Sequence, residues 1–245
     1  MSWQPPEGMD EYLKPTKLCD CDNAMLKEKA DEIVKDVETP KEAALKIFYF
    51  MREEIPFGMD YATTKASRTL KRRKGFCFTK TNLQIALLRA VGIPARCHYS
   101  HISREQIKEI APGFIYNKIP FLTHPWPECY LFNRWIACEA LLDEVLYKSS
   151  LSAGGMTKEQ IPTIDWDGET DLVLYKHSMI KDGGKFPSID DVLITARKRK
   201  EPLPPDNIIP GWFVIFFMNR RIKEIREHEW KITQGEGPPA SPGQG

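Results

Sequence analysis

The chain has 245 residues, a length that suits one substantial globular domain or two small ones. Its 42% hydrophobic content is too high for a disordered protein, and 28% charged residues are ordinary for a folded one. Lys and Arg total 35 against 34 Asp and Glu, so the net charge of +1 argues against a nucleic-acid partner or a polybasic membrane adaptor.

The N-terminal segment and the cysteines bear on the compartment. Residues 1–8 lack a basic stretch followed by an apolar one, so they do not resemble a signal peptide. The longest apolar run, Trp212–Met218, has seven residues, whereas a membrane-spanning helix needs about 20. We therefore expect a cytoplasmic protein without stable membrane insertion, with six reduced cysteines. A processed precursor is the alternative.

Helix signals come first along the chain. One predicted helix follows apolar residues at helical spacing, namely Leu26, Ala30, Ile33, Val34 and Val37. The next begins with Thr39 as N-cap, Pro40 at the first helical position and Glu42 completing a capping box. Pro56 ends this second helix.

A third helix is predicted over residues 78–91, because Gly92 suits the position after a helix and Pro94 blocks continuation. Residues 95–102 then read as a strand, and residues 103–106 as the start of a short helix.

Two strands of a hairpin are predicted next, over residues 126–132 and 135–140. Helices followed by consecutive strands predict an α+β fold rather than a βαβ fold. Residues 208–230 are expected to form a final strand, Trp212–Met218, that runs into an amphipathic helix. A homodimer contact or a membrane-surface contact through this C-terminal region is the alternative interpretation.

The strongest local feature is the tripeptide Gly75-Phe76-Cys77 at the start of the third helix. A thiol at a helix N-terminus faces unpaired backbone N–H groups and the positive end of the dipole, which favour the nucleophilic thiolate. The basic run Lys71–Lys74 lies just upstream and adds to this bias. The structural alternative is that Cys77 is a small apolar cap.

A nucleophilic cysteine needs a base and a group that orients the base. His124 is the candidate base, and Glu139 is its candidate partner on the next strand. A tight turn at residues 133–134 would pair Glu128 with Glu139 and leave His124 about four positions away. A wider loop centred on residues 131–132 would place His124 opposite Glu139, and the sequence leaves both registers open.

Three blocks resemble the transglutaminase-like superfamily. Residues 75–96, GFCFTKTNLQIALLRAVGIPAR, look like its nucleophile helix. Residues 124–128, HPWPE, are similar to its His-Ala-Trp-Val-Glu block, and residues 134–139, RWIACE, fall where the family has a Trp followed four residues later by the catalytic Asp. The blocks occur in family order, and the resemblance covers roughly residues 40–145.

This resemblance implies a papain-like α+β core with N-terminal helices, a nucleophile-bearing helix and an antiparallel sheet. It also implies that Cys77 attacks an amide or related carbonyl, that His124 shuttles the proton and that an acid orients His124. Neither a metal nor an organic cofactor is implied. The oxyanion would be met by the backbone N–H of Cys77 and by a second donor that the sequence does not identify.

Two departures from the family pattern lie beside this chemistry. The third block offers Glu139 where the family has Asp, and Asp143 is a substitute that is less favoured by the alignment. Pro125 and Pro127 flank Trp126, and each removes a donor from the sheet. We therefore expect this strand to lie at an edge, to be bulged or to be irregular.

Substrate-binding residues are expected near the blocks, namely Phe76, Tyr99, His98 and Trp126. The structural alternative for the strand residues is a half-buried position without a role in binding. Cys97, Cys129 and Cys138 fall in predicted strands and are expected in the core. Cys19 and Cys21 are too close together, with no matching second pair, to indicate a zinc site.

The chain is expected to divide into an N-terminal arm (1–20), a catalytic core (21–150), an extension that packs on the core (151–232) and a disordered tail (233–245). Residues 165–171 and 181–186 of the extension are expected to be loops around the cleft.

We expect an enzyme that hydrolyses an amide C–N bond of a small molecule or peptide through a covalent Cys77 intermediate. One alternative is cleavage or rearrangement at a C–C or C–O bonded carbonyl by the same thiol. Another is a protein whose site has lost catalysis and serves as a binding or scaffold surface.

Overall fold

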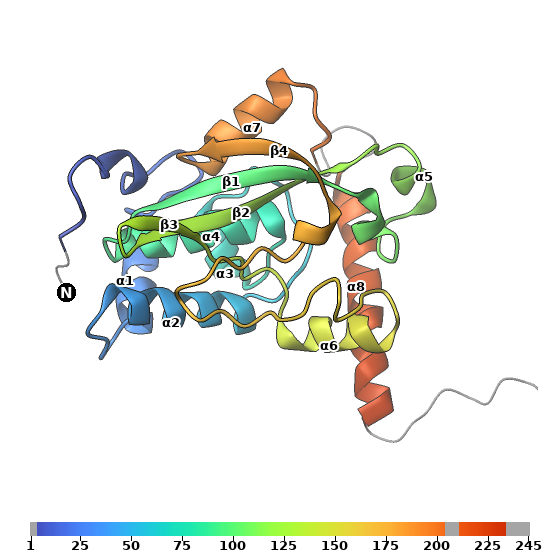
Figure 1. Cartoon of the computed structure of the whole chain (residues 1–245). Helices are drawn as coiled ribbons and strands as arrows, with labels where there is room; N and C mark the ends of the chain where they lie inside the picture. Colours follow the sequence, from blue (N-terminus) through green and yellow to red (C-terminus); the bar gives the residue numbers. More distant parts are fainter. Residues whose placement is uncertain (1–3, 204–210, 234–245) are drawn as a thin grey trace, which may run out of the picture.

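A four-stranded antiparallel sheet, in the order β3-β2-β1-β4, forms one layer of the protein (Figure 1). The computed structural model describes residues 4–203 and 211–233. The strands are β1 (Ala95–Ile102), β2 (Leu122–Leu131), β3 (Arg134–Ala137) and β4 (Met179–Phe186).

Helices and strands both occur along the chain, and the predicted α+β class is confirmed. The α-helices are α1 (Ala24–Ile33), α2 (Pro40–Glu53), α3 (Ala66–Arg72), α4 (Cys77–Ala90), α5 (Gly113–Tyr116), α6 (Glu144–Ser152), α7 (Ile189–Lys198) and α8 (Gly211–Thr233). Short 3-10 helices are η1 (Asp10–Tyr12), η2 (Arg104–Ile107) and η3 (Lys176–Ser178).

The start of α2 follows the predicted capping box. The hydroxyl of Thr39 accepts the backbone N–H of Glu42, and the Glu42 carboxylate accepts the backbone N–H of Thr39. The proline at the first helical position has no N–H to satisfy there, so local sequence alone fixes where the helix begins.

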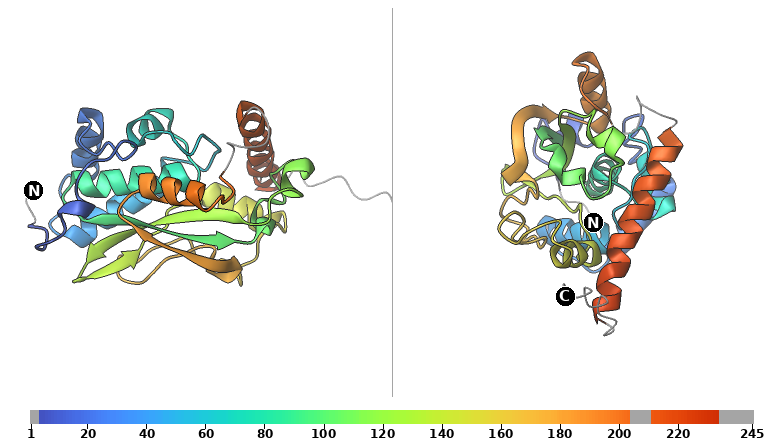
Figure 2. Two further views of the ribbon diagram at one scale, coloured as in Figure 1. Left: turned by 90° about the horizontal axis from the view of Figure 1, so that it is seen from above. Right: turned by 90° about the vertical axis from the view of Figure 1, so that its right-hand side faces the viewer.

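Helix α4 is the central helix of the fold, and its residues Phe78 to Arg89 are all buried. It packs along β2, as Figure 2 shows from above, and also against α1 and α3. Gly75 permits the close approach before it, because a Cβ there would lie 2.7 Å from the Thr79 hydroxyl. Gly92 ends the helix with φ +82°, as predicted.

The β2–β3 hairpin has a two-residue turn at Phe132 and Asn133, with φ of +52° and +57°. Both values are typical of the type I′ turn, whose twist matches that of the flanking strands. The turn pairs Leu131 with Arg134 and, further along, Glu128 with Ala137. This register is neither of the two that the sequence left open.

The expectation that β2 is an edge, bulged or irregular strand is wrong. It is a central strand with an unbroken register to β1. The carbonyl of Pro127 accepts the N–H of Cys138 on the β3 side, so the ring nitrogen of this proline faces the same side. β3 ends at Ala137, so Pro125 and Pro127 lie in the part of β2 that extends beyond β3. The N–H donors that these two prolines lack would have had no β3 residue to bond.

Two further expectations about the extension are wrong. Residues 181–186, expected as a loop, belong to edge strand β4, where Gly183 lies so close to Tyr99 that a Cβ would fall 2.2 Å from its ring. Residues Trp212–Met218, expected as a strand, lie in helix α8. Helical spacing explains this result, because Val214, Met218 and Ile222 are buried on one face.

Helix α8 runs along one side of the molecule (Figure 2, right) and packs against α6. No described helix, α8 included, is long and apolar enough to span a membrane. Residues 1–3, 204–210 and 234–245 lie outside the described residues, so most of the predicted tail is not covered. The predicted division into an arm, a core and an extension stays a prediction.

Candidate active site

Cys77 is the first residue of α4 and is half-buried. The residue before it, Phe76, has an extended backbone and acts as the N-cap position. The thiol therefore lies where helix N–H groups lack intrahelical partners and where the dipole favours negative charge. This placement agrees with the sequence-based prediction of a nucleophile position.

His124 lies on β2 with its side chain buried, and the Cys77 thiol is close enough to affect its pKa. Its Nε2 lies 2.8 Å from Oε1 of Glu139. Burial opposes the charged imidazole, but the Glu139 carboxylate and the Cys77 thiol outweigh it and raise the pKa of His124 to about 10. The contacts thus favour an imidazolium between a thiol and a carboxylate.

Glu139 is held by backbone contacts as well as by His124. Its Oε2 accepts the N–H of Leu174 at 2.7 Å, and its own N–H donates to the Leu172 carbonyl. Continuing the hairpin register places Glu139 opposite Trp126, so His124 is its diagonal neighbour on the same face of the sheet. The longer side chain of Glu, compared with Asp, spans this diagonal.

Asp143, the alternative acid, has other partners. Its carboxylate forms two contacts with Arg226 of α8, at 2.5 and 2.6 Å, and caps α6 by accepting the N–H of Leu146. The guanidinium also counteracts burial and holds the pKa of Asp143 below its usual value. The geometry therefore associates His124 with Glu139 and not with Asp143.

Two aromatic rings flank the imidazole. The Tyr175 ring meets the His124 ring edge-on, with 5.2 Å between the ring centroids. The Trp126 ring is inclined by 30° to the His124 ring, with 6.1 Å between the centroids. Burial, with the Glu139 carboxylate nearby, raises the pKa of Tyr175, so the phenol stays neutral. Sequence analysis missed Leu174 and Tyr175, because a single sequence carries no local signal for a contact made across 35 residues.

The predicted substrate-binding residues occupy different surroundings. Phe76 lines a cavity together with Cys77 and His124. Trp126, His98 and Tyr99 lie outside the part of that cavity wall which the described residues form.

Each of these three side chains has contacts elsewhere. His98 stacks on Trp126 and bonds the carboxylates of Glu128 and Asp182, while the Tyr99 hydroxyl contacts Glu201 and Arg199. Their role in binding stays a prediction.

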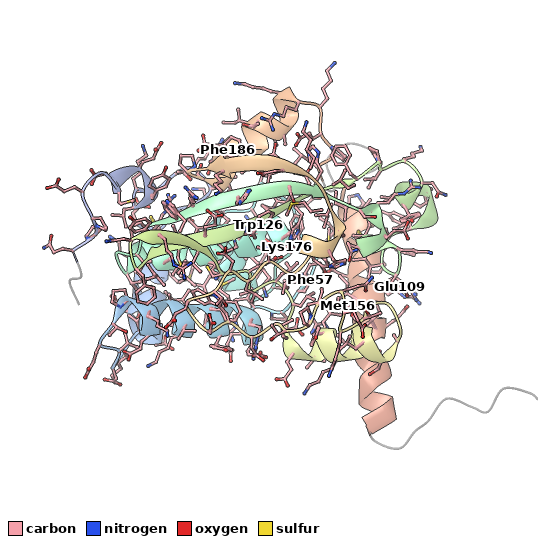
Figure 3. All side chains as sticks on the ribbon, in the orientation of Figure 1. Phe57, Glu109, Trp126, Met156, Lys176 and Phe186 are labelled. Carbon is pink, nitrogen blue, oxygen red and sulfur yellow. The ribbon has the colours of Figure 1, made fainter. Side chains whose placement is uncertain are left out.

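The cavity beside Cys77 has a volume of about 200 Å³ and a largely apolar wall. Figure 3 labels Phe57, Glu109 and Met156, three of its lining residues, at the end of the sheet where α6 and α8 lie. Trp126 and Phe186 are labelled along the sheet itself. Cys77 therefore lines an apolar space whose wall includes side chains of α6 and α8.

The other cysteines are free thiols buried in the protein, and the predicted core positions of Cys97, Cys129 and Cys138 are confirmed. Cys19 and Cys21 interact with each other, and this contact raises the pKa of the first and lowers that of the second. The part of the chain that the structure describes holds no group of three or more His, Cys, Asp and Glu side chains placed to bind a metal ion.

Two residues of the basic run Lys71–Lys74 form ion pairs with carboxylates outside the site. Arg72 pairs with Asp60, and Arg73 pairs with Glu54. The second pair is about half exposed, so its contribution to stability is small.

Lys80, one turn after Cys77, is fully buried, and its ammonium group donates to the Ile55 carbonyl at 2.5 Å. Burial lowers its pKa to about 7. The unfolded chain keeps an ordinary lysine pKa near 10.4, so between pH 7 and 10 the unfolded state binds more protons. This residue therefore makes the free energy of unfolding rise with pH across that window.

We expect the Lys80→Met variant to lack this contribution. The difference in unfolding free energy, wild type minus variant, should grow by up to about 1.4 kcal/mol per pH unit above pH 7. Urea unfolding at several pH values between 7 and 10 measures it, with the exposed Lys158→Met as control. A pH-independent difference for Lys80→Met would contradict the burial of a titrating ammonium group.

The α+β fold thus brings the thiol of Cys77, the imidazole of His124 and the carboxylate of Glu139 to one site, with the imidazole next to the carboxylate. Residues 27–140 match the family model of the transglutaminase-like superfamily. This segment is thus similar to a transglutaminase-like domain, as the sequence blocks suggest, and Cys77, His124 and Glu139 all lie within it.

Solved structures give more distant similarities. A candidate cysteine protease from Cytophaga hutchinsonii is 24% identical with a TM-score of 0.43, over 56% of this chain and 43% of that one. A candidate protease from Parabacteroides distasonis is 14% identical (TM-score 0.37), over 54% and 25% of the two chains. Red sea bream transglutaminase is 12% identical (TM-score 0.33), over 55% and 26%.

The present chain thus aligns with less than half of each of these proteins. A search of curated protein sequences gives no match.

Proposed function

We propose that the protein is a cysteine-dependent acyl-transfer enzyme that hydrolyses an amide C–N bond. The observation that carries this proposal is that Cys77 and His124 line the same cavity while His124 forms a 2.8 Å bond with Glu139. The family match over residues 27–140 supports it independently.

In the first half-reaction, Sγ of Cys77, whose proton has passed to His124, attacks the carbonyl carbon and a C–S bond forms. The resulting oxyanion lies near the backbone N–H of Cys77 and the positive end of α4. When the tetrahedral intermediate collapses, the C–N bond breaks and His124 gives its proton to the departing nitrogen. The products are a free amine and a thioester on Cys77.

In the second half-reaction, water attacks the thioester while His124 accepts one of its protons. A C–O bond forms, the C–S bond breaks, and the acid leaves as the thiolate returns. Throughout both steps Glu139 keeps the imidazole oriented and stabilises its positive charge. An amine that replaces water in the second step would turn hydrolysis into transfer.

Trapping of the acyl-enzyme tests the proposal. Incubation with p-nitrophenyl acetate should add one acetyl group to the wild-type protein, detected by intact mass and mapped to Cys77 by peptide mass analysis. We expect Cys77→Ser to form no thioester, while a Cys129→Ser control, altered at a buried thiol outside the site, should retain the adduct.

A protein that only binds ligands would show no adduct and no stoichiometric labelling of Cys77 by iodoacetamide. An adduct that maps to another residue would also overturn the assignment. Adding a primary amine to the reaction then separates the two activities, because an amide product indicates transfer and acetate indicates hydrolysis.

A further inference from the structure

We propose that the substrate carries a flexible hydrocarbon chain beside its scissile carbonyl, and that this chain lies in the cavity between Cys77 and α8. The inference rests on the proposed function, since it places the reactive carbonyl at Cys77. It adds the chemical class of the substrate.

The wall of the cavity is aliphatic and aromatic over most of its surface. Near Cys77 the wall includes the buried polar side chains of His124, Tyr175 and Thr123, and the Thr123 hydroxyl donates to the Pro202 carbonyl at 2.9 Å. The other polar side chains, Gln106, Glu109 and Ser150, are exposed or half-buried, whereas buried residues such as Leu146 and Met218 form the wall away from Cys77. A peptide in this space would leave backbone N–H and C=O groups without partners, which costs free energy for each group. A hydrocarbon chain has no such groups.

The segments that form the cavity lie about equally within and beyond the matched residues 27–140. Helix α6 and residues 202–203 follow residue 140, and α8 adds a stripe of side chains. This stripe consists of Val214, Met218, Ile222 and Ile225. A further part of the wall comes from residues 102–123, between β1 and the middle of β2. About half of the cavity wall, including all of the α6 and α8 part, therefore comes from beyond the matched segment.

Polar contacts hold α8 in place and preform the cavity. The Asn219 side chain accepts the N–H of Met59 at 2.7 Å and donates to its carbonyl at 3.0 Å. Two turns further along α8, Arg226 contacts the buried Asp143 carboxylate and donates to the Phe57 carbonyl at 3.1 Å. Phe57 and Met59 also line the cavity, so these contacts fix α8 to the segment 57–59 on another side of it. A preformed apolar site avoids the ordering cost of building one upon binding.

The size of the space also suits a chain rather than a few water molecules. A water molecule occupies about 30 Å³ in the liquid and needs two to four polar partners. The cavity of about 200 Å³ is several times larger, and its wall away from Cys77 offers few such partners. Burying each methylene of a chain there should raise kcat/KM by about fourfold.

The first experiment is a chain-length series with the wild-type enzyme, using p-nitroanilides of acetic, butyric, hexanoic and octanoic acids below their aggregation limits. We expect kcat/KM to rise with each added methylene until the cavity is full. A second series, N-alkylacetamides from methyl to octyl, shows whether the chain belongs to the acyl or to the amine side. Flat kcat/KM values in both series would overturn the inference.

A variant and its matched control locate the effect. Met218→Glu places a carboxylate in the cavity wall and should lower the ratio of octanoyl to acetyl kcat/KM by at least about tenfold. Phe216→Ala removes an apolar side chain that is 63% exposed on another face of the same helix, so it should leave the ratio unchanged. Equal loss of the ratio in both variants would contradict the cavity assignment.

Binding of cis-parinaric acid to the Cys77→Ala protein separates the two proposals, because it requires the cavity and no chemistry. Saturable fluorescence enhancement that decanoate displaces supports the cavity inference even if no substrate is turned over, in which case the proposed function fails alone. Absence of binding, with normal acetylation of Cys77 in the wild type, overturns the inference and leaves the proposed function intact.

Discussion

Replacement of Cys77 by alanine is expected to lower kcat by about 10⁴- to 10⁶-fold, because every covalent step uses its sulfur. His124→Ala should cause a loss of similar size, since the group that takes the thiol proton and later protonates the leaving group is removed. Steady-state kinetics with the preferred p-nitroanilide measure both losses.

The double variant provides a stricter test of the same idea. If Cys77 and His124 act as one unit, removing both should cost little more than removing either. Additive losses would mean that the two residues act independently, contrary to the contact between them. The exposed His177→Ala is a matched control and should keep wild-type kcat. Wild-type turnover by Cys77→Ala would refute the nucleophile assignment outright.

Glu139→Gln is expected to lower kcat by about 10² to 10⁴-fold and to change the pH profile. The carboxylate is a main reason that the pKa of His124 is raised, so a neutral amide should lower that pKa. Since His124 must be protonated to release the amine, the alkaline limb of kcat against pH should move to lower pH.

The glutamine oxygen can still accept the N–H of Leu174, so Glu139→Gln should fold normally, and its thermal midpoint provides the check. Glu139→Asp keeps the charge but shortens the side chain. Its kcat, and the pH of its alkaline limb, should be intermediate between those of Glu139→Gln and the wild type. An unchanged alkaline limb in Glu139→Gln would show that another group sets it.

Local sequence predicts the elements whose causes are local. The capping box at Thr39 and Glu42, the close approach at Gly75 and the left-handed Gly92 each act within a few residues of the boundary they set. For the same reason the position of Cys77 at the start of a buried helix was accessible to sequence analysis.

Features that depend on distant partners were not accessible in this way. The hairpin register follows from the left-handed conformations of Phe132 and Asn133, and Phe132 carries no glycine-like signal for such a turn. The apolar run Trp212–Met218 is compatible with a strand or a helix, and only the buried positions facing α6 and the 57–59 loop decide it. Prolines in β2 are tolerated because of where β3 ends, which is a property of the whole sheet.

The hydrogen bond from the Leu174 N–H to the Glu139 carboxylate affects the order in which the site can form during synthesis on the ribosome. Chains are synthesised from the N-terminus, and Cys77 and His124 emerge long before Leu174 does. The Glu139 carboxylate cannot form all of its contacts until residue 174 has been synthesised. Asp143 can pair with Arg226 only later, once α8 has been synthesised. The Glu139 carboxylate therefore takes its final position only after Cys77 and His124 have both been synthesised.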